Sequence, residues 1–226
     1  MPLPWPASAV KSALAPREFH VRRVLSGPLA GALLDLDLTH HTQVWLGLYE
    51  VETKPWLRRL SRGIRTALDV GSADGWYTIY FLKKTSAARV MAFEPDPAAL
   101  DVFRRNLILN GAEGFEPSAT LVGSRDGAGT TTLDSHLPEI SFPCLVKVDV
   151  EGAELAVLEG AARLLAAPGV SWMVEIHSAD METRCRDRLE AEGYVVHTVH
   201  KAWWRAVVRE KRPLPVNHWL IAVRPD

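Results

Sequence analysis

Cysteine is scarce in this chain, and long apolar runs are absent. Of 226 residues only Cys144 and Cys185 are cysteines, placed on a predicted strand and a predicted helix. They form neither a disulfide framework nor a structural zinc site, so we expect reduced thiols and a cytoplasmic protein. No apolar segment approaches the roughly 20 residues of a membrane-spanning helix. The opening stretch MPLPWPASAVKSALAP is too rich in proline for the apolar segment of a signal peptide.

An excess of charge of one sign is also missing. The chain has 26 Lys and Arg residues against 27 Asp and Glu, a formal net charge of −1, which gives no general attraction toward nucleic acid or a membrane. Hydrophobic residues make up 47% and charged residues 23%, as in ordinary soluble globular proteins. We expect a main domain over residues 61–226 and an N-terminal arm and cap segment over residues 1–60.

From residue 64 onward, apolar runs alternate with segments of helical periodicity. Helices are predicted from Trp76 onward and over 96–111, 151–166 and 181–192. Alternating strands and helices favour an α/β fold with a mostly parallel sheet that is covered on both faces. No helix separates the last two strands, so the last strand is expected to be antiparallel. The predicted strands span 64–70, 88–95, 118–123, 142–150, 170–177, 194–199 and 218–224.

Two further regions have less regular patterns. Before residue 60, the stretches FHVRRVL, GALLDLDL and TQVWLGLYEVETKPWLRRL predict two strands and a helical segment that cap the ligand edge of the sheet. Residues 200–213 combine five Lys or Arg with Trp203 and Trp204. Such a mixture can bind nucleic acid or an anionic sugar. We prefer a hairpin whose tryptophans pack against a neighbour, and the eight tryptophans of the chain are compatible with a homodimer.

The stretch LDVGSADGWYT joins a predicted strand to a helix through a glycine turn. Gly71 and Gly75 permit positive φ and let a ligand approach the backbone. The spacing departs from G-x-G-x-x-G, and Asp74 is a poor neighbour for pyrophosphate, so a cationic or zwitterionic ligand fits better. Glu94 ends the next strand, 23 residues after Gly71, where a carboxylate can accept both hydroxyls of an adenosine ribose. Together these features predict an adenosine-containing ligand.

A second set of polar residues follows the strand in LVKVDVEGAE. Asp149 falls at the carboxyl end of this strand, where open α/β sheets bind their ligands. Glu151 and Glu154 suit the first turn of the following helix, where the helix dipole favours acids. Glu175 and His177 end the next strand, which should lie beside the first. We therefore expect Asp149, Glu175 and His177 around one position.

These three side chains have more than one chemical interpretation. His177 is our preferred general base, oriented or charged by Asp149 or Glu175. The same set could instead bind one divalent cation through oxygen and nitrogen ligands, although the sequence alone does not support a metal. A histidine that only caps its strand is the structural alternative.

Several of these stretches resemble successive motifs of FkbM-type S-adenosylmethionine-dependent methyltransferases. They are LDVGSADGWYT, AFEPDPAALDVFRRNLILNG, LVKVDVEGAELAVLEGA and MVEIH, and the similarity spans roughly residues 45–177. The resemblance implies the class I methyltransferase fold, Rossmann-like, with a seven-stranded, mostly parallel sheet and an antiparallel last strand. It also implies S-adenosylmethionine as cofactor and O-methylation of a hydroxyl on a small molecule, such as a natural product or a sugar.

The resemblance further implies roles for the cofactor-binding residues. The methionine part of the cofactor would contact Asp69, Gly71, Ser72 and Gly75, with Tyr77 and Thr78 nearby. The ribose and adenine would contact Glu94, Pro95, Asp96, Ser124 and Arg125. Glu50, in the family-like segment WLGLYE, is a weaker candidate for contact with the methionine ammonium or the acceptor.

Other functions stay open at this point. An N- or C-methyltransferase would keep the cofactor, and a reactive amine would need less help from a base such as His177. A non-catalytic binding module would retain the fold without turnover. A dehydrogenase would bind NAD(H), but the glycine turn lacks the dinucleotide spacing.

Overall fold

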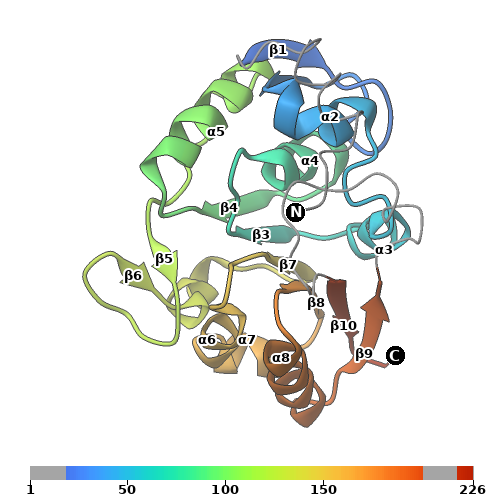
Figure 1. Ribbon diagram of the computed structural model, residues 1–226. Coiled ribbons are helices and arrows are strands. Elements are labelled where there is room, and N and C mark those ends of the chain that lie inside the picture. The colour runs from blue at the N-terminus through green and yellow to red at the C-terminus, as the bar shows by residue number, and fades with distance from the viewer. Residues whose placement is uncertain (1–18, 201–217, 226) are drawn as a thin grey trace, which may run out of the picture.

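The computed structural model describes residues 19–200 and 218–225, and a central sheet of six strands organises them (Figure 1). The strand order is β4–β3–β7–β8–β10–β9. Strands β4, β3, β7 and β8 pair in parallel, whereas β10 pairs antiparallel with both β8 and β9. This confirms the predicted Rossmann-like α/β fold with an antiparallel last strand. The bounds are Thr66–Val70 (β3), Arg89–Phe93 (β4), Cys144–Val148 (β7), Val170–Ile176 (β8), Val195–Val199 (β9) and His218–Val223 (β10).

The prediction that residues 118–123 form a seventh strand of this sheet is wrong for the described residues. Only Leu121–Val122 (β5) is a strand, and it pairs in parallel with Thr130–Thr131 (β6) in a separate two-stranded sheet. The segment touches the central sheet through a bridge between Ser118 and Phe93. Further along, the N–H groups of Leu121 and Gly123 donate to the β6 side, to the carbonyls of Gly129 at 3.0 Å and Thr131 at 2.9 Å.

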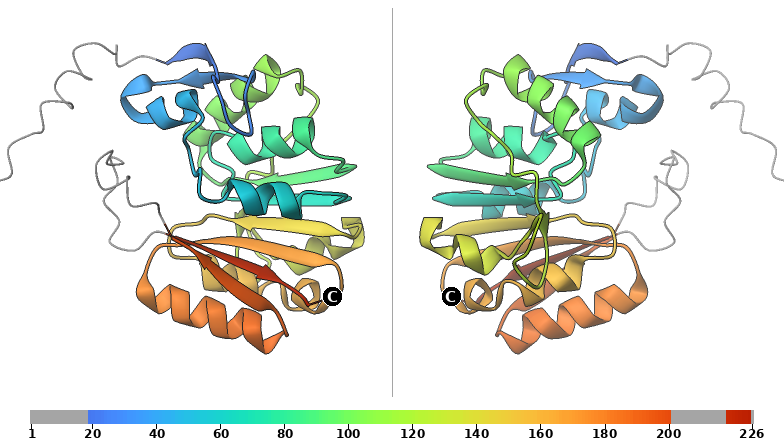
Figure 2. Two further views of the ribbon diagram at one scale, coloured as in Figure 1. Left: turned by 90° about the vertical axis from the view of Figure 1, so that its right-hand side faces the viewer. Right: turned by 90° about the vertical axis from the view of Figure 1, so that its left-hand side faces the viewer.

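Helices cover both faces of the central sheet, as Figure 2 shows edge-on. On β7, Val146 and Val148 pack in a cluster with α6, α7 and α8, whereas Leu145 packs on the opposite face with α4 and α5. This alternation follows from the two-residue period of a strand, and burial on both faces explains the continuous apolar runs. The helices span Trp76–Lys84 (α4), Pro97–Leu109 (α5), Glu154–Glu159 (α6), Ala162–Ala166 (α7) and Ala179–Ala191 (α8).

The described part of the N-terminal segment packs on the α4–α5 face. It contains the predicted strands as an antiparallel hairpin, His20–Arg23 (β1) and Leu33–Leu36 (β2), but two helices, Leu38–Leu46 (α2) and Lys54–Leu60 (α3), where one helical segment was expected. Asn106 of α5 satisfies the free edge of β2, because its Oδ1 accepts the N–H of Asp35 at 2.7 Å. Leu34 and Leu36 share a buried cluster with the core of the sheet. Residues 200–213 were predicted to form a hairpin whose tryptophans pack against a neighbour, and all of them except His200 lie outside the described residues.

The helix predicted over 151–166 is divided in two at Gly160. The carbonyl of Gly160 accepts the N–H of Asp134 at 3.0 Å and is therefore lost to the helical ladder. Asp134 lies in the 3₁₀ helix η1 (Leu133–Glu139), and its carboxylate accepts the N–H groups of Arg163 and Leu164 at 2.9 Å each. The second helix, α7, thus begins at a carboxylate supplied by a distant segment.

Two other sequence expectations concern cysteines and membrane spans. Cys144 in β7 and Cys185 in α8 are buried and free, as predicted. Within residues 19–200 and 218–225, none of the helices has both the length and the apolar character that crossing a bilayer requires.

The break at Gly160 gives a first test. A Cβ at Gly160 would lie 2.0 Å from the carbonyl oxygen of Gly123, a backbone atom that cannot rotate away. We expect Gly160→Ala to lower the free energy of unfolding by about 1–3 kcal/mol, measured by urea denaturation. Gly114→Ala is the matched control, because nothing lies within 4 Å of a Cβ there. Equal stability of the two variants would contradict this account of the break.

Candidate active site

The glycine turn after β3 brings the ends of three strands together. The N–H of Gly71 donates to the carbonyl of Phe93, at the end of β4, at 2.9 Å. Gly71 has φ +72°, and a Cβ there would lie 1.9 Å from the carbonyl oxygen of Asp149, just past β7. Gly75 has φ +86° and lies against the ring of Phe103. Both glycines are therefore required by left-handed backbone and by close contacts.

Glu94 links this turn to the start of α5. Its Oε2 accepts the N–H of Ala73 and its Oε1 accepts the N–H of Asp96, both at 2.9 Å. Asp96 in turn caps α5, as predicted, by accepting the N–H of Ala98 at 2.9 Å. Each carboxylate oxygen of Glu94 retains a further lone pair. The side chain can therefore accept two ribose hydroxyls while it holds the turn, which fits the predicted adenosine ligand.

A buried lysine that the sequence analysis did not single out lies under the turn. Lys147 Nζ is 3.1 Å from Asp69 Oδ1 and 3.6 Å from Asp149 Oδ2, and it donates to the carbonyl of Gly71 at 2.7 Å. Burial alone would lower the pKa of Lys147, but Asp69, Asp149 and Glu50 outweigh it and raise this pKa. The available signal was a single lysine in an otherwise apolar strand, opposite Asp69 in the parallel register.

The three residues predicted to carry the chemistry do converge. One ligand atom each from Asp149, Glu175 and His177 lies within 4.8 Å of the others. Nε2 of His177 is 3.7 Å from Asp149 Oδ1 and 3.9 Å from Glu175 Oε2. They come from the carboxyl ends of β7 and β8, which are neighbours in the sheet. The side chain of Asp149 is 21% exposed, so the cluster can be reached from solvent.

Glu154 differs from its predicted role as a helix-start acid. It does begin α6, but it is fully buried and its Oε1 lies 2.5 Å from Nδ1 of His177. The hydrogen-bond partner that orients His177 is therefore Glu154, whereas Asp149, predicted to orient or charge it, acts on it through its charge at 3.7 Å. Burial lowers the pKa of His177, but the Glu154 hydrogen bond and the charges of Asp149, Glu154 and Glu151 raise it overall.

Carboxyl groups are crowded on the inner side of this cluster. Burial raises the pKa of Glu50 to about 7, and Asp149 adds to the effect, although the hydroxyl of Tyr77 donates to Glu50. Burial, followed by the charges of Asp149 and Glu50, raises the pKa of Glu175 well above its ordinary value. The arrangement therefore favours a ligand that brings positive charge.

The predicted cofactor residues line the carboxyl edge of the sheet at different depths. Those after β3 are largely buried, and Thr78 donates to Asp69 Oδ2 at 2.7 Å beneath the turn. The buried members are Asp69, Ser72, Gly75, Tyr77, Thr78 and Glu94. The exposed members, on the predicted adenine side, are Pro95, Asp96, Ser124 and Arg125.

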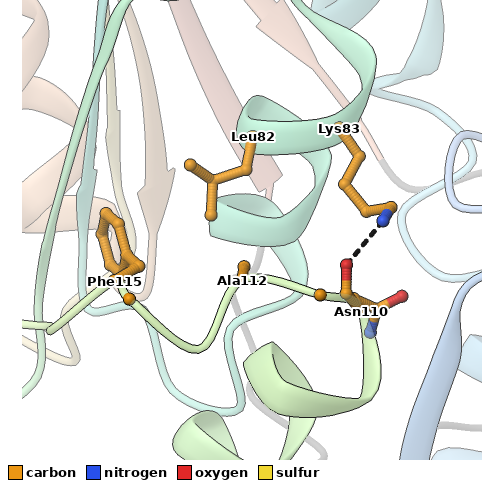
Figure 3. A pocket seen from close by; sticks show the side chains of 7 residues that line it. Leu82, Lys83, Asn110, Ala112 and Phe115 are labelled. Atoms are coloured by element: carbon orange, nitrogen blue, oxygen red, sulfur yellow. Dashed lines mark hydrogen bonds between the residues drawn. The ribbon is translucent and has the colours of Figure 1, made fainter.

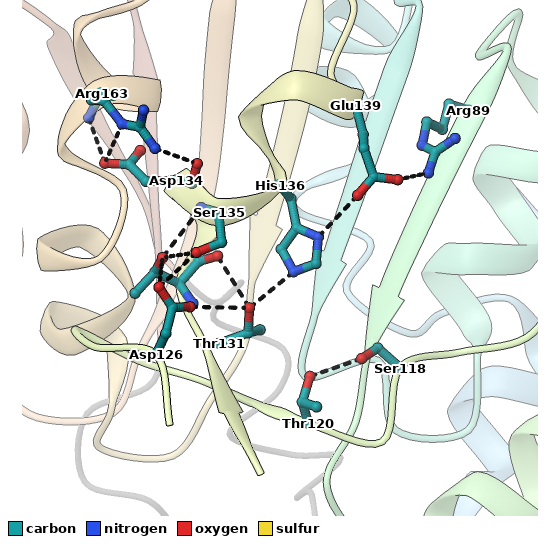
Figure 4. Close-up of polar contacts among 11 residues, drawn as sticks. Arg89, Ser118, Thr120, Asp126, Thr131, Asp134, Ser135, His136, Glu139 and Arg163 are labelled. Carbon is teal, nitrogen blue, oxygen red and sulfur yellow. Dashed lines mark hydrogen bonds and ion pairs between the residues drawn. The ribbon is translucent and has the colours of Figure 1, made fainter. Parts of the chain in front are cut away.

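The loop that carries Ser124 and Arg125 is held by a polar network (Figure 4). Asp126 accepts the N–H of Thr132 at 2.8 Å and the hydroxyl of Ser135 at 2.7 Å. The ring of His136 packs edge-on against Phe93, with ring centroids 5.1 Å apart. These contacts fix the loop beside the end of β4, where the adenine is expected.

A pocket of about 560 Å³ is lined by the last turn of α4 and by the segment that follows α5 (Figure 3). Within it, Lys83 Nζ donates to the carbonyl of Asn110 at 2.6 Å, so the lysine is already engaged. We do not assign this pocket to the candidate site. Its lining residues are Leu82, Lys83, Asn110, Gly111, Ala112, Gly114 and Phe115.

Known methyltransferases resemble this chain over part of its length. A profile described as "Methyltransferase FkbM domain" matches residues 111–196. Over these residues the chain is similar to FkbM-type methyltransferases. The FkbM match begins after the glycine turn and Glu94, and it includes Asp149, Glu154, Glu175 and His177.

Three relatives show how far this similarity extends. Methyltransferase 1 of Beauveria bassiana is 26% identical over an alignment that covers 41% of this chain and 57% of that protein. Methyltransferase sdnD of Sordaria araneosa is 39% identical over 79 residues, 34% of this chain and 27% of its own. The crystal structure of methyltransferase FkbM from Methylobacillus flagellatus KT has a TM-score of 0.56 at 17% identity, covering 72% of this chain and 44% of that one. The chain thus covers 57% of the first relative and less than half of each of the other two. The structural likeness supports the fold alone.

The buried ion pairs of Lys147 lead to a stability prediction. Lys147→Met would leave Asp69, which is fully buried, without its cation. We expect the free energy of unfolding to fall by about 3–5 kcal/mol in denaturant titrations. Lys84→Met, at an exposed position of α4, should change it little. The double variant Asp69→Asn/Lys147→Met should lose less than the sum of the single variants, and strict additivity would refute the pairing.

Proposed function

We propose that this chain transfers the methyl group of S-adenosylmethionine to a hydroxyl of a small molecule, such as a natural product or a sugar. One observation carries the proposal. In a chain whose residues 111–196 match the FkbM methyltransferase domain, the glycine turn with Glu94 and the cluster of Asp149, Glu175 and His177 share the carboxyl edge of one sheet. Open α/β sheets bind their ligands at this edge.

The residues of the glycine turn and of β4 would hold the cofactor. When bound, S-adenosylmethionine supplies a methyl group made electrophilic by its sulfonium. Glu94 accepts the ribose hydroxyls through its remaining lone pairs, and Gly71 leaves the backbone open to close approach. The surplus of carboxylates around Lys147 favours a ligand that carries positive charge at this place.

The cluster would prepare the acceptor. A hydroxyl becomes an adequate nucleophile when its proton is removed during or before attack, and alignment with the methyl group provides much of the remaining rate. The cluster can remove this proton with His177 as general base or with a bound cation that acidifies the hydroxyl. Either role requires Nε2 of His177 to face the acceptor, and its position 3.7 Å from Asp149 Oδ1 and 3.9 Å from Glu175 Oε2 supports this assignment.

Cofactor binding can be tested without knowing the acceptor. We expect S-adenosylhomocysteine to bind the wild-type chain in a calorimetric titration, and Glu94→Gln to weaken this binding at least about tenfold, since a hydrogen bond to a charged group contributes about 1.5–3 kcal/mol. Glu116→Gln is the control, because the side chain of Glu116 is 71% exposed and its ion pair is with Arg104 of α5. A folded wild-type chain that binds no S-adenosylhomocysteine would overturn the proposal.

The choice of a hydroxyl acceptor needs a separate assay. With radiolabelled S-adenosylmethionine and panels of phenols, sugars and amines, we expect transfer to a hydroxylated acceptor, reduced about 10²-fold or more by Glu175→Gln. Affinity for S-adenosylhomocysteine should change little in this variant. Transfer to amines that survives the substitution would favour N-methylation. Cofactor binding without turnover on any panel would favour a non-catalytic module.

A further inference from the structure

The cluster of Asp149, Glu175 and His177 has the spacing of a coordination sphere. Two ligands that each lie about 2.0–2.2 Å from one cation are about 3–4 Å apart. The measured separations from Nε2 of His177 are 3.7 Å to Asp149 Oδ1 and 3.9 Å to Glu175 Oε2. All three ligand atoms lie within 4.8 Å of one another. Small side-chain rotations would bring them around one ion.

The second observation concerns how the imidazole is presented. Glu154, which is fully buried, holds Nδ1 of His177 at 2.5 Å and thereby favours a proton on that nitrogen. A neutral imidazole then turns the lone pair of Nε2 toward the two carboxylates. This carboxylate–histidine arrangement is the usual outer support of a metal-bound histidine. The side chain of Glu154 contacts the His177 nitrogen that faces away from Asp149 and Glu175, so it orients the ring without being one of the three ligands.

The neighbouring lysine does not complete the charge balance. Lys147 is closest to Asp69, at 3.1 Å, and also donates to the carbonyl of Gly71. It reaches the other oxygen of Asp149, Oδ2, at 3.6 Å, and leaves Oδ1 on the side of His177. Lys147 thus lies on the far side of Asp149 from His177, and a divalent cation among the three ligand atoms would supply positive charge on the near side.

We propose that Asp149, Glu175 and His177 bind one divalent cation of the Mn²⁺ type, with Glu154 as the residue that positions His177. Two carboxylates and one imidazole are a mixed oxygen and nitrogen set that suits Mn²⁺. Its role rests on the proposed function: the acceptor hydroxyl binds the cation and releases its proton to solvent. The alkoxide oxygen then forms a bond to the methyl carbon as the carbon–sulfur bond breaks, which gives a methyl ether and S-adenosylhomocysteine.

Cation binding is tested directly with Mn²⁺ as the probe. Electron paramagnetic resonance of free Mn²⁺, titrated with the full chain with and without S-adenosylhomocysteine, should show one tight site per chain in at least one of the two states. Glu175→Gln and Asp149→Asn should each weaken it at least about tenfold, and Glu154→Gln by about 10–100-fold. The control variant Glu116→Gln, at an exposed side chain, should leave the affinity for Mn²⁺ unchanged.

A spectroscopic signature separates a ligand from a merely nearby histidine. The electron spin-echo of bound Mn²⁺ should carry modulation from an imidazole nitrogen, lost in His177→Gln. Circular dichroism and urea unfolding confirm that each variant is folded. Absence of a tight site in both states, or a site unaffected by Glu175→Gln and His177→Gln, would overturn the cation proposal. Binding of S-adenosylhomocysteine, measured in EDTA, reports on the proposed function separately, so one can fail while the other stands.

Discussion

The ammonium of Lys147 is the interaction on which the rest of this site depends. It is nearly fully buried, and it joins the side chain of Asp69, the backbone of Gly71 and the side chain of Asp149. These belong to the ends of two adjacent parallel strands, β3 and β7. Without the lysine, two carboxylates would approach each other in a medium that solvates charge poorly. With it, the glycine turn and Asp149 of the cluster are held in one position.

The carboxylates that Lys147 does not neutralise give the site its chemical character. Glu50 and Glu175 lie buried on the same side, and the hydroxyl of Tyr77 satisfies only the first. A protein tolerates such crowding when protonation or a bound cation offsets it. Both a sulfonium and a divalent cation meet this condition, and they would sit at different points: near the glycine turn and near His177. The two proposed ligands therefore relieve different parts of one electrostatic imbalance.

Much of the fold was predictable because local pattern and global architecture agree. Strands such as 142–150 are apolar on both faces, and that pattern, with the intervening helices, indicates a covered parallel sheet. The convergence of Asp149 and Glu175 followed from the adjacency of consecutive strands. Residues 118–123 show the limit, since their apolar run is as strand-like as the others. Their pairing with β6 depends on backbone partners that the run itself does not encode.

The role of Glu154 was not predictable for a related reason. An acid in a first helical turn is common, and its spacing from Asp149 does not tell whether it faces solvent or a neighbouring strand. The orientation of α6 is set by the break at Gly160, whose contact with Gly123 and hydrogen bond to Asp134 come from outside the helix. Long-range packing thus decides what a local pattern leaves open.

The two ends of the proposed cofactor site are supported by different contacts. At the methionine end, Gly71 packs against the carbonyl of Asp149, so the turn and the reactive cluster cannot shift independently. At the adenine end, Ser124 and Arg125 lie on a loop that Asp126 and His136 brace from their own segment. The tight contact protects the alignment that an in-line displacement needs. The separately braced loop can therefore change in sequence, with little effect on that alignment, as long as its own polar network is kept.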